Sequence, residues 1–187
     1  MKAIKQFIIL SSLFLFCFPA FGADSKFTFE PIYGVETRLV RYPEPARYST
    51  DAVYGARVLY GMTILSGEAE YTTTKSRKDY SSTDTKVEDS VERLSLGLRT
   101  TFPVSQFIGA YFRAGGRAQR GETVIETAGD KETKDNPLRI DPYAGAGLQL
   151  AFHSNFALNA GATMIRNAED KYDAQYTLGL SAKFGNR

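Results

Sequence analysis

The sequence has little of the chemistry that most catalytic or metal sites need. Its 187 residues include one cysteine, one histidine and no tryptophan. Cys17 lies in an amino-terminal apolar run that we expect to be removed, so the mature chain is predicted to have no disulfide and no cysteine-ligated metal. No paired carboxylates or metal-ligand cluster stands out either. We therefore predict no catalytic site, no metal and no cofactor.

A long apolar run occurs only at the amino terminus. Two lysines precede the run at 7–18, and small residues follow it. This order is typical of a secretory signal peptide, and the run is shorter than the roughly 20 residues that a spanning helix needs. We predict cleavage after Gly22, with residues 1–22 as the signal peptide and residues 23–187 as one mature domain.

An excess of one charge sign is also missing. The chain has 23 Lys and Arg against 21 Asp and Glu, and Lys2 and Lys5 belong to the predicted signal peptide, which leaves 21 against 21. A balanced chain gives no reason to expect a nucleic-acid partner.

The mature sequence does have alternation of apolar with polar or glycine residues. Successive side chains of a strand point to opposite faces, so such alternation predicts strands. The eight predicted strands are 26–40, 51–62, 65–75, 90–102, 107–119, 138–152, 156–166 and 172–184. We predict an all-β fold, a closed eight-stranded antiparallel up-and-down transmembrane β-barrel.

The predicted connections alternate in length. Short turns fall at 63–64, 103–106 and 153–155, and long polar loops at 41–50, 76–89 and 120–137, with a modest loop at 167–171. Short turns on the periplasmic rim and long loops on the outer rim are typical of bacterial outer-membrane barrels. The long loops are expected to be solvated, or to serve as a contact surface that includes Tyr42, Pro43, Pro45 and Tyr48.

Alternation alone does not show which face lies inside, because a soluble lipocalin-like carrier would bury the apolar face. Three features favour lipid-facing apolar residues: glycines interspersed among charges on the polar face, aromatics near strand ends, and strands long enough to cross an apolar band of about 25 Å. The charged residues predicted to line the lumen are Glu30, Glu36, Arg38, Arg57, Glu68, Glu70, Arg93, Arg99, Arg113, Arg117, Arg139, Asp141, Asp173 and Lys183.

These inward charges number eight positive and six negative. Isolated buried charges are costly, so we interpret the set as a salt-bridge plug that fills the lumen. The alternative is a narrow pore that the arginine excess biases toward anions.

The last strand carries a resemblance to a known family. It ends in an alternating run from Tyr176 through Gly179 to Phe184. With the barrel pattern, this resembles the small outer-membrane barrels of the OmpA/OmpX type, and these three residues look like the signal that the barrel-assembly machinery recognises. Residues 185–187 follow the terminal aromatic, which departs from the family pattern. The resemblance implies a monomer in the bacterial outer membrane, with lipid and lipopolysaccharide around it and the barrel-assembly machinery as a partner.

One motif raises the alternative of a lipid-modifying barrel enzyme. The pair His153 and Ser154 invites comparison with the outer-membrane lipid A deacylase, also an eight-stranded barrel. Adjacent residues of a strand face opposite sides, and here they fall in a predicted periplasmic turn. We therefore assign them a turn role, and predict a structural or surface-interaction protein with at most a narrow pore. The sequence names no ligand or host partner.

Overall fold

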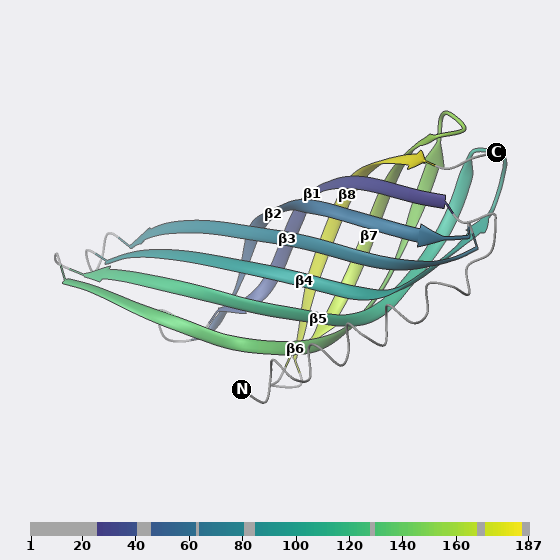
Figure 1. The fold of residues 1–187 in the computed structure, drawn as a ribbon. Coiled ribbons are helices and arrows are strands. Elements are labelled where there is room, and N and C mark those ends of the chain that lie inside the picture. The colour runs from purple at the N-terminus through teal and green to yellow at the C-terminus, as the bar shows by residue number, and fades with distance from the viewer. Residues whose placement is uncertain are drawn as a thin grey trace.

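The computed structural model describes residues 26–40, 46–62, 64–80, 85–127, 130–167 and 171–184. Its strands form one closed antiparallel barrel in which each pairs with its neighbours in sequence and the last pairs with the first (Figure 1). The strands are β1 (Lys26–Val40), β2 (Arg47–Gly61), β3 (Leu65–Tyr80), β4 (Thr85–Pro103), β5 (Ile108–Thr127), β6 (Asp130–Ala151), β7 (Phe156–Arg166) and β8 (Tyr172–Phe184). The predicted fold class is confirmed. The described residues include no helix with the length and apolarity to cross a membrane.

The barrel closes through β1 and β8, whose register runs from Phe27 opposite Phe184 to Thr37 opposite Ala174. In lipid an unpaired backbone group costs several kcal/mol, so an open sheet edge is not tolerated there. Closure satisfies these groups, and short turns at 104–107 and 152–155 join neighbouring strands at one rim.

The two faces of the barrel are those that the alternation predicts. Leu98 and Leu148 on the outside are 52% and 60% exposed, whereas the side chain of Arg57 is fully buried inside. The lumen holds most of the buried charged residues, and the outer surface is apolar. This arrangement suits a lipid environment and is the inverse of a soluble lipocalin-like carrier.

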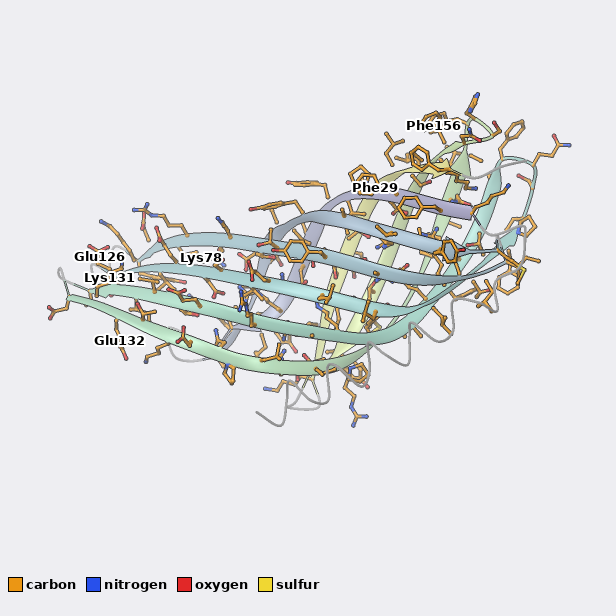
Figure 2. The ribbon with its side chains drawn as sticks, viewed as in Figure 1. Phe29, Lys78, Glu126, Lys131, Glu132 and Phe156 are labelled. Atoms are coloured by element: carbon orange, nitrogen blue, oxygen red, sulfur yellow. The ribbon has the colours of Figure 1, made fainter. Side chains whose placement is uncertain are left out.

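Aromatic residues mark the limits of the outer apolar band. Phenylalanines gather at the rim with the short turns, where the rings of Phe27 and Phe184 lie 6.2 Å apart, and Figure 2 shows Phe29 and Phe156 toward this end. Exposed tyrosines mark the other limit: Tyr33, Tyr54, Tyr71 and Tyr176. Two aromatic girdles are expected where a barrel meets the two membrane interfaces.

Two of the long loops were predicted to be longer than they are in the structure. The segments 76–89 and 120–137 form paired strands through most of their length, with Lys78 opposite Val87 and Glu122 opposite Asp135. In Figure 1 the strands β3–β6 accordingly run on well beyond the ends of the others. We call this part the extension; it comprises residues 74–80, 85–92, 120–127 and 130–137. The strand β2 also begins earlier than predicted, at Arg47.

A register irregularity lies where the extension leaves the barrel. Gln119 is opposite Arg139 but Gly121 is opposite Asn136, so one residue of β5 faces two of β6, Pro137 and Leu138. Proline has no N–H to donate, so the irregularity accommodates it without breaking a regular ladder bond. Bulges of this kind bend strands and increase their twist.

Candidate functional site

Six of the predicted lumen charges form one compact group, the lower cluster: Glu30, Arg57, Glu68, Glu70, Arg99 and Arg113. Arg57 donates to Glu30 at 2.8 Å and to Glu70 at 2.6 Å, and its Nε lies 3.6 Å from Glu68. Arg113 is 2.7 Å from both Glu68 and Glu70. Three cations and three anions from β1 to β5 thus form ion pairs with one another inside the barrel.

Two tyrosines and an asparagine complete the lower cluster. The guanidinium carbon of Arg99 lies 3.7 Å from the ring centroid of Tyr111, and that of Arg113 lies 4.8 Å from the ring centroid of Tyr143. Asn159 donates to Glu30 at 2.9 Å. Cation–π contacts gain strength where water is excluded, so the rings add to the ion pairs.

Glycines opposite Tyr111 make room for its ring. A Cβ at Gly147 would lie 2.3 Å from Cζ of Tyr111, and one at Gly161 would lie 2.1 Å from its hydroxyl oxygen. These two glycines therefore belong to the packing of the plug, which gives a specific reason for glycine on the inward face.

A second group, the upper cluster, is centred on Glu36. Arg117 donates to Glu36 at 2.6 Å and Arg93 lies 3.1 Å from it. Arg117 also donates to Gln175 at 3.2 Å, and Arg93 donates to Thr74 at 2.7 Å. All of these side chains are buried. The prediction missed Gln175 and Thr74 as partners because their inward position carries no charge.

The extracellular mouth of the lumen holds further predicted charges. Arg38 is bonded to Asp89 and lies 3.6 Å from Asp51. Arg139 donates to Asp141 at 2.7 Å and lies 3.8 Å from Asp173.

Asp51 and Asp89 were not predicted, and they raise the inward carboxylates from six to eight. Lys78 was not predicted either, and its amine lies 3.1 Å from Asp51. The excess of inward cations is therefore smaller than the sequence indicated. Asp89 was missed because it falls in a predicted loop, although it lies an even number of residues from Arg93 and therefore on the same face of β4.

Lys183 does not join the plug. It is partly exposed at the periplasmic mouth, beside a cavity of about 50 Å³. Among the described residues, no carboxylate lies within ion-pair distance of its amine. Its position facing the lumen axis agrees with the alternation, but it has no share in the ion pairs.

The pair His153 and Ser154 lies in the β6–β7 turn, as predicted. The two side chains are closer than alternation would place them, with Ser154 Oγ 3.4 Å from Nδ1 of His153. That nitrogen also accepts a hydrogen bond from the Asn155 amide at 3.3 Å, and the ring packs against Phe156. No carboxylate contacts His153 in the part of the chain that is described. These contacts fit a turn role.

The predicted assembly signal lies on β8. Tyr176 and Phe184 are exposed on the lipid face. Gly179 faces inward, where a Cβ would lie 2.3 Å from Oε1 of Glu30. Packing against the lower cluster is thus one reason for glycine at this position. Recognition by the assembly machinery stays a prediction.

Comparison with known proteins agrees with this geometry. The outer membrane protein beta-barrel domain family matches residues 9–184. The chain belongs to this family. No curated protein matches the sequence.

Solved members of the outer-membrane barrel class show the same fold. Ail, the attachment invasion locus protein of Yersinia pestis, solved in complex with the heparin analogue sucrose octasulfate, superposes with a TM-score of 0.59 at 14% identity, covering 86% of this chain and 98% of Ail. The amino-terminal barrel domain of Pseudomonas aeruginosa OprF gives 0.56 at 18% identity, covering 84% and 97%. Neisserial surface protein A gives 0.55 at 15%, covering 85% and 97%.

Family and fold together make the chain a transmembrane β-barrel of the bacterial outer membrane. The match is to a barrel family and points to no enzyme family. The predicted signal peptide at 1–22, the loop residues Tyr42, Pro43 and Pro45, and residues 185–187 lie outside the described residues.

Proposed function

We propose that this outer-membrane barrel is a surface-interaction protein that presents the extension to protein partners, has a lumen closed to solutes, and has no catalytic role. The observation that carries the proposal is the continuation of β3–β6 as a paired sheet beyond the apolar band. Binding surfaces are commonly built on parts that a rigid scaffold holds in place.

The lower cluster supports a closed lumen. Its six charged side chains are buried and form ion pairs with one another, with only Oε2 of Glu68 and Nε of Arg113 left without a hydrogen bond, and Tyr111 and Tyr143 pack onto them. A solute could pass only if such pairs separated, and breaking a buried pair costs about 3–5 kcal/mol. The barrel is therefore better suited to hold a surface structure in place than to conduct solutes across the membrane.

The outward face of the extension supports a protein partner rather than a polyanion. Its charged residues are five cations, Lys75, Arg77, Lys86, Arg120 and Lys131, and six anions, Asp79, Glu88, Glu92, Glu122, Glu126 and Asp135. Figure 2 shows Glu126 and Lys131 together at the far end. Ail was solved with a heparin analogue, but a polyanion requires an excess of positive charge, and this face has none.

The edge of β6 offers a specific mode of contact. Pairing of β6 with β7 begins at Tyr143 opposite Ile165, so no strand among the described residues pairs with 130–142 on that side. Backbone N–H and C=O groups that point to this edge can bond to an added strand. Pro137 and Pro142 limit such pairing to the outer part, 130–136.

The test compares the full chain with a shaved variant in which residues 122–135 are replaced by Asn-Gly. A phage-displayed library of random twelve-residue peptides is selected on each protein in lipid nanodiscs. The proposal predicts peptides that bind only the full chain and protect amides of 130–136 from hydrogen exchange. Equal enrichment on both proteins, or no enrichment on either, would contradict it.

A further inference from the structure

The outer part of the β6 edge is a short segment with defined limits. Strand β6 begins at Asp130, and Pro137 has no N–H to donate, so residues 130–136 are the part that can pair with an added strand. All of these residues except Lys134 are exposed. Among the described strands, only β5 pairs with them. The edge therefore has room for one more strand of about this length.

These limits define the register in which the segment would pair with a second copy of itself. Antiparallel pairing over the full length places the middle residue, Thr133, opposite Thr133 of the other copy. The further opposite residues would be Lys131 with Asp135, Glu132 with Lys134 and Asp130 with Asn136. Opposite charges in such positions stabilise a strand pair. Since the pair has two-fold symmetry, each contact occurs twice, and no like charges lie opposite each other.

The β5 side of the segment favours a cation at one of these positions. Within one chain Asp135 lies opposite Glu122, so two carboxylates face each other across the ladder. Like charges directly opposite destabilise a strand pair. A lysine on the other side of Asp135 would offset this repulsion, and the antiparallel register places Lys131 of the second copy there. The charge pattern thus complements a second copy on both sides of Asp135.

The parallel orientation of a second copy is unfavourable. In a parallel pair without a shift, Lys131 would lie beside Lys131 and Asp135 beside Asp135, so like charges would meet along the edge. Two copies in one membrane are related by an axis along the membrane normal, which keeps their β6 strands pointing the same way. An antiparallel pair reverses one strand, so its two barrels would lie in facing membranes.

We propose that residues 130–136 pair antiparallel with the same residues of a second copy whose barrel lies in a facing membrane. Within each membrane the chain stays a monomer, as the family resemblance implies. The inference rests on the proposed contact role of the extension and names the partner of the β6 edge. Figure 2 shows Lys131 and Glu132 at the far end of the extension, where a facing copy would meet them.

The test uses the full chain in phosphatidylcholine nanodiscs that hold one copy each, so that no two copies share a membrane. Sedimentation velocity at micromolar concentrations measures the fraction of paired discs, and negative-stain electron microscopy shows how they are arranged. We expect saturable face-to-face pairing of the wild type and none of the shaved variant. Wild-type discs that stay single, or that pair edge to edge, would overturn the proposal.

Two charge reversals test the register. Lys131→Asp places a carboxylate opposite Asp135, and Asp135→Lys places an ammonium group opposite Lys131. Each variant alone should pair at least about tenfold more weakly than the wild type. An equimolar mixture should recover pairing, since the introduced carboxylate of one variant then lies opposite the introduced lysine of the other. Failure of the mixture to recover would refute the antiparallel register.

Lys75→Asp is the matched control. It makes the same charge reversal on an exposed residue of the extension, opposite Ser90 on β4 and away from β6. We expect unchanged pairing, and heat-modifiable gel mobility shows that each variant is folded. A loss in Lys75→Asp as large as in Lys131→Asp would assign the effect to net charge and contradict pairing at β6.

The peptide selection separates this inference from the proposed function. If peptides protect 130–136 of the full chain but wild-type discs stay single, the extension keeps its contact role and a second copy is not its partner. If the discs stay single and no peptide is enriched, the proposed function fails together with the inference.

Discussion

Arg57 contacts all three carboxylates of the lower cluster. It is bonded to Glu30 and Glu70 and lies 3.6 Å from Glu68. Buried ion pairs are weak sources of net stability, but removal of one partner leaves uncompensated charge in a low-dielectric interior. The effect of a substitution here therefore measures how completely the plug excludes water.

We expect Arg57→Met to lower the free energy of unfolding by about 3–5 kcal/mol, because three carboxylates would face one another with one cation fewer. Urea unfolding in lipid vesicles, followed by far-ultraviolet circular dichroism, measures this. Arg77→Gln is the control: Arg77 pairs with Glu88 at 3.4 Å on the exposed extension, and its loss should cost less than about 1 kcal/mol. Similar losses in the two variants would mean that the lumen is hydrated.

Gly161 tests the packing of the plug. We expect Gly161→Ala to cost about 1–3 kcal/mol, since its Cβ would lie 2.1 Å from the Tyr111 hydroxyl oxygen. Tyr111→Phe removes that atom, so the double variant should lose less than the sum of the single losses. The same unfolding measurement gives all three values. Strict additivity would show that Gly161 and Tyr111 do not touch.

For single residues, the sequence predicts well which face of the barrel a side chain points to, but it predicts poorly which other side chains it contacts. The alternation places Arg57, Glu70 and Arg113 on one face, and the structure has them there. Which carboxylate each arginine meets depends on strand register and on distances across the lumen. Asn159 contacts Glu30 from 129 residues away, and no local pattern contains that information.

The elements β3–β6 show where alternation stops being informative. In the extension the outward face meets water, and the inward face, although buried at residues such as Thr85 and Asp89, also carries polar side chains. Polar residues therefore occupy both faces and the period of two disappears. The strands of the extension are instead held by cross-strand pairs, such as Arg77 with Glu88 and Glu92 with Arg120. These pairs become recognisable only once the register is known, so the sequence indicated loops.

We expect the shaved variant to fold. It removes only residues beyond the barrel rim, and the pairing of β5 with β6 from Ile108 opposite Leu150 to Gln119 opposite Arg139 stays intact. The temperature at which heat-modifiable mobility is lost should fall by no more than a few degrees, as for surface changes of about 1 kcal/mol. Failure to form the folded band would show that the extension is part of the barrel's stability.

The whole molecule turns its apolar side chains toward lipid and its charged side chains toward the lumen, as the physical chemistry of the bilayer requires. Closure of the sheet and the lipid-facing apolar surface could be predicted because lipid tolerates neither open edges nor unpaired charges. The extension could not be predicted, since water imposes no comparable constraint on the residues that meet it.

A charge placed on the outer face tests this orientation. We expect Leu98→Arg, near the middle of the apolar band, to cost about 2–4 kcal/mol of folding free energy in lipid vesicles. Ser90→Arg lies on the same face of β4 but within the extension, beside Glu122 on β5, and should cost almost nothing. An equal cost at the two positions would place Ser90 and Leu98 in the same environment.

Conductance across a planar lipid bilayer tests the closed lumen most directly. The purified full chain should insert and give no stable open channel at neutral pH, because the buried side chains of the lower and upper clusters are joined by ion pairs across the lumen. An inserted porin in the same bilayer shows that channels are detectable. Large, long-lived conductance steps from the folded protein would contradict the plug and the closed lumen proposed for this barrel.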